Sequence, residues 1–326
     1  MSYKDDVAQR YQKEQLPLVP DLANCTLRLE LTNICNHTCV FCPHSMQMRK
    51  KGYMDKVLAK RLLCEAYELG VRRVALFMNG EPFMAKGLEE YIRYSKELGY
   101  EYVFITTNAS FATEERIMSV MDAGIDSIKF SINAGTPESY LKIHGEDGYE
   151  KAMARLCFAN EYRKKKNIPC RLLAGFVVTD LTIPEMQQQY DRVAPLVDDI
   201  LFFKPDNFGG YMVERYKEYL TKPIMTDLPF YDYPDKCTPC SLLFNSVNIT
   251  YEGYLTLCCS EALNMMVTCD LNTMTLADAW SSDIMKGIRR KHLENQLEGT
   301  QCYKCMYNVS AEVKPLNEEL YFKSIK

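Results

Sequence analysis

Fourteen cysteines are the unusual feature of this sequence of 326 residues. Three of them, Cys35, Cys39 and Cys42, lie within eight residues, directly after the apolar run at 27–31. One loop at a strand end can therefore place three thiolates around one metal centre. Three thiolates hold an iron-sulfur cubane with one iron open to a small-molecule ligand, whereas a structural zinc site normally has four protein ligands. The spacing favours a cluster, and zinc with His44 as the fourth ligand stays open.

A second group of seven cysteines lies between residues 237 and 305. Cys237-x2-Cys240 and Cys302-x2-Cys305 have the pair spacing of a zinc ribbon, but more than sixty residues separate the pairs, beyond the usual ~15–20. Between the pairs, residues 251–254 predict a hairpin turn whose second strand ends near Cys258. Residues 276–290 predict a helix. A second metal centre is expected here, with zinc as the alternative.

The elements that must position these thiolates alternate along residues 24 to 210. Three times an amphipathic stretch ends in a glycine, Gly70, Gly99 or Gly124, and an apolar run follows, which predicts a helix, its C-cap and a buried strand. Runs at 27–31, 172–178 and 200–203 complete six strands, so the sequence predicts an α/β fold of βα units. Both a doubly wound open sheet and a partial (β/α)6 barrel fit this pattern, and both place the chemistry at the carboxyl ends of the strands.

The Cys-x3-Cys-x2-Cys loop, with Phe41 before its third cysteine, resembles the signature of the radical S-adenosylmethionine (SAM) enzymes. The resemblance implies a partial (β/α)6 TIM-like barrel and a [4Fe-4S] cluster held by Cys35, Cys39 and Cys42. It also implies cleavage of SAM to a 5'-deoxyadenosyl radical that abstracts a substrate hydrogen. The segment Gly80-Glu81-Pro82 is similar to the family segment that meets the SAM amino group, although Asn79 replaces the usual first glycine. Further cofactor-binding residues expected by similarity are Phe41, Asn108, Ser131 and, for the SAM carboxylate, Arg171.

The order of cysteine, hairpin glycine, cysteine, tryptophan helix and closing Cys-x2-Cys resembles the SPASM and twitch domains that follow radical SAM barrels. It implies a small C-terminal cysteine-rich domain with one auxiliary [4Fe-4S] cluster, held by Cys240, Cys258, Cys302 and Cys305. Of the cysteines left over, Cys237, Cys259 and Cys269, we take Cys259 as the candidate catalytic hydrogen donor because it adjoins a ligand. Core thiols are expected at Cys25, Cys64, Cys157 and Cys170.

With one auxiliary cluster, the chain resembles the twitch-domain dehydrogenase that oxidises an aminocyclitol alcohol. We therefore expect a radical SAM oxidoreductase that oxidises a secondary alcohol of a sugar or aminocyclitol, with the auxiliary cluster as electron acceptor and a donor such as flavodoxin or ferredoxin. A carbohydrate epimerase that uses Cys259 is one alternative. Another is peptide or protein modification, which we place behind carbohydrate chemistry. Such enzymes often carry a leader-peptide-binding domain or a second auxiliary cluster, and neither is expected here, since only about twenty residues precede the first strand. Outside enzymology, a zinc-stabilised binding protein remains.

Charge and hydropathy limit the partners. The 39 basic and 43 acidic side chains give a formal charge of -4, so there is no bulk electrostatic reason to bind nucleic acid or an anionic membrane. No apolar run has the length of a membrane span or the position of a secretion signal, which predicts a cytoplasmic protein. The basic runs at 49–51 and 163–166 are expected to be solvated, and His37, His144 and His292 to lie in loops or at the surface.

These patterns divide the chain into five parts. An N-terminal arm is expected at 1–22, the radical SAM partial barrel at 23–215 and a linker at 216–236. The SPASM/twitch-like auxiliary cluster domain is expected at 237–310, and a C-terminal tail at 311–326.

Overall fold

One curved ten-stranded sheet organises the part of the chain that the computed structural model describes, residues 16–228, 230–231 and 238–325. Its order is β10-β9-β8-β1-β2-β3-β4-β5-β6-β7. The strands are β1 Thr26–Leu29, β2 Arg73–Ala75, β3 Tyr102–Thr107, β4 Ser127–Ser131, β5 Arg171–Val177, β6 Asp199–Phe203, β7 Phe230–Tyr231, β8 Ser246–Ile249, β9 Tyr254–Thr256 and β10 Val267–Asp270. Strands β1 to β6 run parallel in chain order, which confirms the six predicted strands and the barrel-like βα layout.

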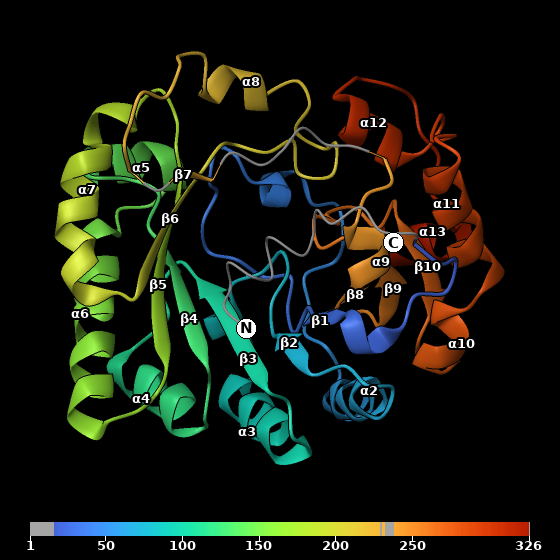
Figure 1. The fold of residues 1–326 in the computed structure, drawn as a ribbon, viewed down its shortest axis with the longest axis horizontal. Coiled ribbons are helices and arrows are strands. Elements are labelled where there is room, and N and C mark those ends of the chain that lie inside the picture. The colour runs from blue at the N-terminus through green and yellow to red at the C-terminus, as the bar shows by residue number, and fades with distance from the viewer. Residues whose placement is uncertain (1–15, 229, 232–237, 326) are drawn as a thin grey trace.

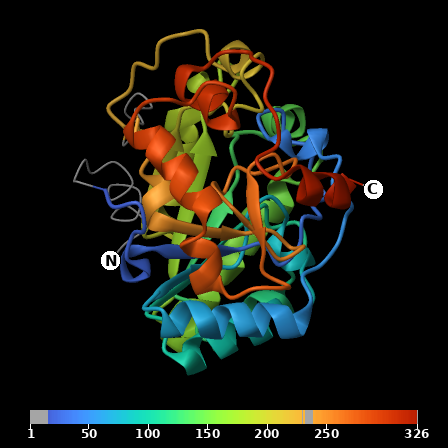
Figure 2. The same cartoon turned by 90° about the vertical axis from the view of Figure 1, so that its right-hand side faces the viewer.

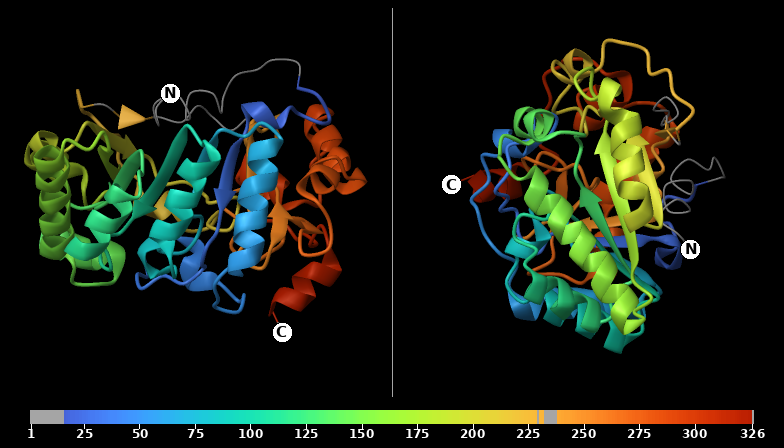
Figure 3. Two further views of the ribbon diagram at one scale, coloured as in Figure 1. Left: turned by 90° about the horizontal axis from the view of Figure 1, so that it is seen from below. Right: turned by 90° about the vertical axis from the view of Figure 1, so that its left-hand side faces the viewer.

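Helices cover the convex face of the parallel strands (Figures 1 and 3). They are α2 Lys56–Glu68, α3 Leu88–Leu98, α4 Glu114–Asp122, α5 Pro137–His144, α6 Tyr149–Lys166 and α7 Met186–Val193. The three predicted glycine caps are confirmed, because Gly70, Gly99 and Gly124 have φ values of 97°, 103° and 93° after α2, α3 and α4. A residue with a side chain adopts this left-handed conformation only with strain. Each of these glycines therefore turns the chain from a helix into the next strand.

Alternating side chains divide each central strand between two apolar layers. Ile128 and Phe130 of β4 belong to the large core under the helices, whereas Phe104, Leu173 and Phe203 form a small cluster on the concave face. Successive residues of a strand point to opposite faces, so Lys129 and Ser131 also lie on the concave side. The concave face therefore combines a small apolar cluster with polar side chains such as Lys129 and Ser131.

The C-terminal strands continue the sheet of the barrel. Strand β8 pairs in parallel with β1, and the β8–β9 hairpin is formed as predicted, with β10 antiparallel to β9 (Figure 2). We expected a separate module. The barrel is not closed, and β8 covers the edge of β1 that would otherwise be unpaired. Within the predicted linker, β7 pairs with β6.

The helices of this half are α8 Tyr216–Tyr219, α9 Leu242–Asn245, α10 Leu276–Trp280, α11 Asp283–Leu293, α12 Gln301–Tyr307 and α13 Glu318–Ile325. The single helix predicted for 276–290 is wrong. The chain leaves α10 after Trp280, and the Ser282 hydroxyl accepts the Met285 amide to cap α11. A serine N-cap starts a new helix because it satisfies an amide that has no intrahelical partner. None of the helices in the described part of the chain combines the length and apolar character needed to cross a bilayer.

Candidate active site

The three N-terminal cysteines lie on the loop after β1, residues 33–42, which we call the cysteine loop. Backbone hydrogen bonds attach it to the end of α5, from the Thr38 amide to His144 O at 3.1 Å and from the Val40 amide to Ile143 O at 2.9 Å. A tight turn from Cys39 O to the Cys42 amide, at 3.0 Å, closes it. The fold therefore holds the loop in one conformation at the carboxyl end of β1.

The electrostatics of the loop suit a metal centre. Burial raises the pKa of the Cys35 thiol to about 12, that of Cys42 to about 11, and that of Cys39 well above its usual range. Neighbouring thiols add to these shifts, since Cys35 and Cys42 each raise the pKa of Cys39. Three thiolates packed together away from water need a cation to stabilise their charge. A bound metal would supply it.

The spacing of the donors argues against one zinc ion on the three cysteines. Thiolates on one zinc lie within about 4.6 Å of one another, twice the Zn–S bond length. Among the described residues, the only group of three or more donors that all lie within 4.8 Å is His37, Cys39 and His144. His44, the fourth ligand considered for zinc, is instead 3.0 Å from Asn33 O through Nε2. A multinuclear cluster fits the three cysteines better.

The segment after β2 packs directly on the cysteine loop. The Glu81 amide donates to Ile34 O at 2.9 Å, and a Cβ on Gly80 would lie 2.2 Å from Thr32 O. Only glycine permits this approach of two backbones. Pro82 then begins a short 3-10 helix, Pro82–Met84.

The Glu81 carboxylate is buried beside the cysteine loop. It accepts hydrogen bonds from Thr107 Oγ1 at 2.6 Å, the Asn108 amide at 2.8 Å and the Phe83 amide at 3.0 Å. Burial raises its pKa to about 7, although these donors oppose the shift. A carboxylate has about four acceptor sites, so one remains for a ligand.

The other residues expected to bind SAM are placed differently. Asn108 Nδ2 is 3.7 Å from Cys35 Sγ, Phe41 is buried within the cysteine loop, and Ser131 ends β4 on the concave side. These positions are compatible with SAM binding, so the contacts of Asn108, Phe41 and Ser131 with SAM stay predictions. Arg171 is the first residue of β5 and pairs with Ser127, the first residue of β4. It lies at the amino ends of the parallel strands, opposite the cysteine loop, and this position does not fit a contact with the SAM carboxylate.

Asn79, the residue that replaces the usual glycine, links the two halves of the chain. Its Nδ2 donates to the backbone carbonyl of Glu261, two residues after Cys259, and lies 3.4 Å from Glu30 Oε1. The departure from the family pattern therefore has a structural role. Sequence analysis could not detect it, because Glu261 is 182 positions away.

A second thiol group comprises Cys240, Cys258, Cys302 and Cys305, which we call the auxiliary thiols. A hydrogen bond with Cys259 and burial raise the pKa of Cys258 well above its usual range, and Cys240 adds to the shift. Burial does the same for Cys302, with Cys240 and Cys305 adding to it. These effects indicate that Cys240 lies near Cys258 and Cys302, and that Cys305 lies near Cys302. The four stay the predicted ligands of the auxiliary cluster, and buried thiolates there would need a cation as the cysteine loop does.

The remaining seven cysteines have different environments. Cys259 adjoins the auxiliary thiols through a side-chain hydrogen bond with Cys258, and Cys237 lies outside the described residues. Cys269 is buried on β10, with Sγ 3.4 Å from Ser282 Oγ, which is the environment of a structural thiol. Cys25 and Cys170 are buried, which confirms their predicted core positions. Cys64 and Cys157, also predicted as core thiols, are instead half-buried on helices.

The loop after β6 ties the auxiliary thiols to the barrel. Asn207 Nδ2 donates to Cys305 O at 2.9 Å, and Gln301 Nε2 donates to Gly209 O at 2.9 Å. Tyr211 donates to the Glu261 carboxylate at 2.6 Å. Both thiol groups are therefore attached to the carboxyl edge of the parallel strands.

A buried ion pair also connects the halves, and it corrects our expectation of a solvated side chain for Arg49, whereas Lys50 and Lys51 of the same run are exposed as expected. Arg49 Nη2 is 2.6 Å from Glu30 Oε2 and 2.5 Å from Glu252 Oε2, and the Arg49 and Glu30 side chains have no exposed surface. Glu30 directly follows β1, and Glu252 lies in the β8–β9 turn. The two acids are far apart in sequence, so their shared cation could not be predicted. Lys164, Lys165 and Lys166 of the second run are exposed as expected.

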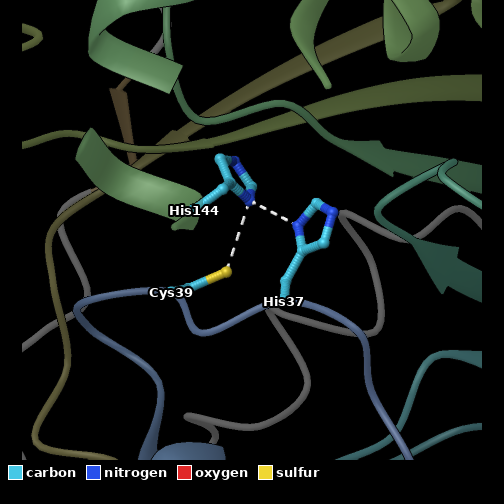
Figure 4. Close-up of side chains that lie close together, drawn as sticks. All are labelled: His37, Cys39 and His144. Carbon is cyan, nitrogen blue, oxygen red and sulfur yellow. Dashed lines mark hydrogen bonds between the residues drawn. The ribbon is translucent and has the colours of Figure 1, made fainter. Parts of the chain in front are cut away.

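The three histidines expected in loops or at the surface are buried. His37 Nδ1 lies 3.1 Å from His144 Nδ1, and Cys39 Sγ lies 3.3 Å from the same nitrogen (Figure 4). Burial lowers the pKa of His37 to about 4 and that of His144 to about 3, so both rings are neutral at pH 7. His292 accepts the Cys240 amide through Nδ1 at 3.3 Å. A neutral imidazole therefore contacts each thiol group: His144 beside Cys39, and His292 beside Cys240.

Two family models match the chain. The radical SAM superfamily model covers residues 29–186, and the SPASM model, an iron-sulfur cluster-binding domain, covers residues 240–306. The chain contains a radical SAM domain followed by a SPASM domain. Its radical SAM and SPASM domains imply a SAM-binding [4Fe-4S] cluster, an auxiliary cluster and SAM itself, as expected. The donor sets described above fit these groups.

Relatives of this radical SAM protein carry different activities in their names. A probable GTP 3',8-cyclase of Saccharolobus islandicus is 32% identical over 127 residues, 39% of this chain and 41% of that protein. The SAM-dependent 2-deoxy-scyllo-inosamine dehydrogenase of Niallia circulans is 28% identical over 123 residues, 37% of this chain and 49% of that protein. Both matches span less than half of the relative.

The fold agrees with a solved structure. The crystal structure of BtrN in complex with AdoMet and 2-DOIA aligns with a TM-score of 0.57 and 20% identity. The alignment covers 90% of this chain and 96% of BtrN. The partial barrel and the C-terminal domain are therefore shared along almost the whole length of both chains.

Proposed function

We propose that this radical SAM enzyme oxidises a secondary alcohol of a sugar or aminocyclitol to a ketone. Cys35, Cys39 and Cys42 hold the SAM-binding cluster, and the auxiliary thiols hold the second cluster. When bound, these groups and SAM supply a 5'-deoxyadenosyl radical as hydrogen acceptor and a second site as electron acceptor. The reaction breaks one carbon-hydrogen bond, releases the hydroxyl proton and removes one further electron.

One observation carries the proposal: both thiol groups are attached to the same edge of the barrel. Asn79 joins the segment beside the cysteine loop to Glu261, and Asn207 joins the end of β6 to Cys305. A substrate at the carboxyl ends of the strands would therefore lie between them. Dehydrogenation needs an acceptor close to the carbon that loses hydrogen, and this arrangement supplies one.

The residues of this chain have separate tasks in the proposed reaction. Glu81 provides the carboxylate that meets the SAM ammonium group, and Asn108 and Ser131 contact the rest of SAM. The apolar cluster on the concave face, which includes Phe104 and Phe203, keeps water from a reactive intermediate. On the same face, Lys129 Nζ lies 5.4 Å from the centre of the Phe203 ring, from where it is placed to bind a substrate oxygen.

The relatives support this reaction without deciding it. The dehydrogenase of Niallia circulans acts, by its name, on 2-deoxy-scyllo-inosamine, which is an aminocyclitol. The cyclase relative makes GTP the competing substrate. Epimerisation is the second chemical alternative, favoured by the contact of Cys259 with Cys258.

The test is a substrate panel under anaerobic conditions, with reconstituted enzyme, SAM and a chemical reductant. Aminocyclitols and sugars are compared with GTP, and both 5'-deoxyadenosine and the mass of the product are measured. The proposal expects 5'-deoxyadenosine formation that depends on a cyclitol or sugar, and a product that has lost two hydrogens.

Matched variants separate the alternatives. Cys302→Ala with Cys305→Ala should retain SAM cleavage and lose the ketone, because only the acceptor is removed. A product of unchanged mass that carries solvent hydrogen and disappears in Cys259→Ala would establish epimerisation instead. Consumption of GTP would replace the proposal with cyclase chemistry.

A further inference from the structure

Three side chains beside the cysteine loop already have the spacing of a mononuclear metal site. The Nδ1 atoms of His37 and His144 and the Sγ of Cys39 all lie within 4.8 Å of one another (Figure 4). His144 Nδ1 is 3.1 Å from His37 Nδ1 and 3.3 Å from Cys39 Sγ. Tetrahedral zinc, with bonds of ~2.05 Å to nitrogen and ~2.3 Å to sulfur, separates such ligand atoms by about 3.4 and 3.6 Å. The two separations at His144 therefore differ from these values by about 0.3 Å, and the third pair, His37 and Cys39, lies within 4.8 Å.

The far nitrogens of both rings have the partners that metal-binding histidines use. His144 Nε2 is 2.7 Å from the carbonyl oxygen of Ile132, which can only accept. Asn133 Nδ2, a donor, lies 3.3 Å from the same nitrogen, but the contact with Ile132 O is the shorter one. It favours the tautomer with the ring proton on Nε2, in which Nδ1 presents its lone pair. His37 Nε2 is 2.7 Å from Ser110 Oγ, which can accept the corresponding proton. Such outer partners fix the tautomer and the ring orientation of ligating histidines.

The fold holds these ligands in place from two directions. His37 and His144 are 2% and 1% exposed, and the Tyr140 ring stacks on His144 with centroids 4.0 Å apart. His144 ends α5, and its backbone oxygen accepts the Thr38 amide of the cysteine loop. Little conformational entropy is left to lose when an ion binds, which favours affinity.

We propose that His37, Cys39 and His144 bind one divalent transition-metal ion of the zinc type whenever the SAM-binding cluster is absent. Cys39 releases its thiol proton to solvent on binding, and a fourth position stays open to water. The cluster needs the same Cys39, so the ion and the cluster exclude each other. Zinc at this site therefore blocks insertion of the SAM-binding cluster and leaves the auxiliary thiols free.

The experiment uses the full chain with Cys35→Ser and Cys42→Ser, purified anaerobically with its auxiliary cluster. This double variant cannot hold the first cluster but keeps the three proposed ligands. Co²⁺ is the probe, followed by the electron paramagnetic resonance of the high-spin ion and by metal analysis. One tightly bound cobalt per chain is expected.

Further substitutions in that background locate the ion. His37→Asn or His144→Gln removes a ligand and should weaken cobalt binding at least ~100-fold, since loss of an outer partner alone costs ~10–100-fold. Ser110→Ala, which removes only an outer partner, should fall within that smaller range. His44→Asn is the matched control, a buried histidine next to the same loop, and should bind cobalt unchanged.

Two results would overturn the proposal. One is a double variant that binds no cobalt, and the other is unchanged affinity in both histidine variants, which would place the ion elsewhere. The visible absorption of the auxiliary cluster reports the folding of each variant. Ser110→Ala deletes a single hydroxyl, so it keeps the test decisive if a histidine variant does not fold.

Discussion

Replacing Gly80 by alanine should force apart the two backbones that form the SAM-binding end of the barrel. The added Cβ would lie 2.2 Å from Thr32 O, 2.9 Å from Thr32 C and 3.0 Å from Ile34 O. All three are backbone atoms, so no side chain can rotate away. The segment that carries Glu81 has to move by roughly 1 Å to reach an ordinary contact distance.

The expected loss has two parts. Overpacking of a tight site costs ~1–3 kcal/mol, and losing the hydrogen bond from the Glu81 amide to Ile34 O costs about 1 kcal/mol. The free energy of unfolding should therefore fall by about 2–4 kcal/mol. Because a displacement of ~1 Å can lower a rate ~100-fold, SAM cleavage should fall by a comparable factor.

Anaerobic urea denaturation and 5'-deoxyadenosine formation measure the two effects. Gly287→Ala is the matched control: it lies inside α11, and a Cβ there meets nothing within 4 Å. The same chemical change should stabilise the chain there by about 0.5–1 kcal/mol, because alanine favours a helix over glycine. A Gly80→Ala enzyme with normal stability and normal SAM cleavage would refute this account of the backbone contact.

Three further predictions follow. Arg49→Met should lower the free energy of unfolding, measured by urea denaturation, by about 3–5 kcal/mol, because it leaves the carboxylates of Glu30 and Glu252 without their cation. Lys51→Met, at an exposed position, should change it by less than about 0.5 kcal/mol. Equal effects of the two substitutions would contradict the ion-pair assignment. The Glu81 pKa is raised to about 7, so the carboxylate takes up a proton as the pH falls through 7, and calorimetry should find SAM bound up to ~10-fold more weakly at pH 6 than at pH 8. Glu81→Gln should remove this pH dependence. An affinity of the wild-type enzyme that does not change with pH would count against the contact between Glu81 and the SAM amino group. Replacing all three cysteines of the cysteine loop by alanine should abolish 5'-deoxyadenosine formation and reduce iron from about eight to about four per chain, and retained SAM cleavage would reject the ligand assignment.

Local patterns predicted much of the barrel because its strands and helices are determined by short-range chemistry. A glycine after an amphipathic stretch ends a helix wherever it occurs, and Gly70, Gly99 and Gly124 did so. Apolar runs between these caps became the parallel strands. Helix boundaries were harder to predict where a capping residue lies inside an apolar pattern of helical spacing. Ser282 is such a residue, and it divides one expected helix into α10 and α11.

Orientation and burial were less predictable. Arg171 has the charge to bind a carboxylate, but it precedes the apolar run at 172–178, and the register of β5 with β4 places it at the amino ends of the strands. Arg49 belongs to a basic run that is normal for a surface, yet its partners come from β1 and from the β8–β9 turn. Charge alone does not reveal whether a side chain will find buried partners.

By itself, the sequence determined the presence of two cysteine groups, their unequal spacing and the alternating elements that carry them. These features depend on residues that are close together in the chain. The tertiary structure decided what surrounds the cysteines: the neutral pair of His37 and His144 next to Cys39, the link from Asn79 to Glu261, and the extension of the barrel sheet by β8. Each of these contacts joins residues more than a hundred positions apart, and only the packing of the folded chain brings them within hydrogen-bond distance.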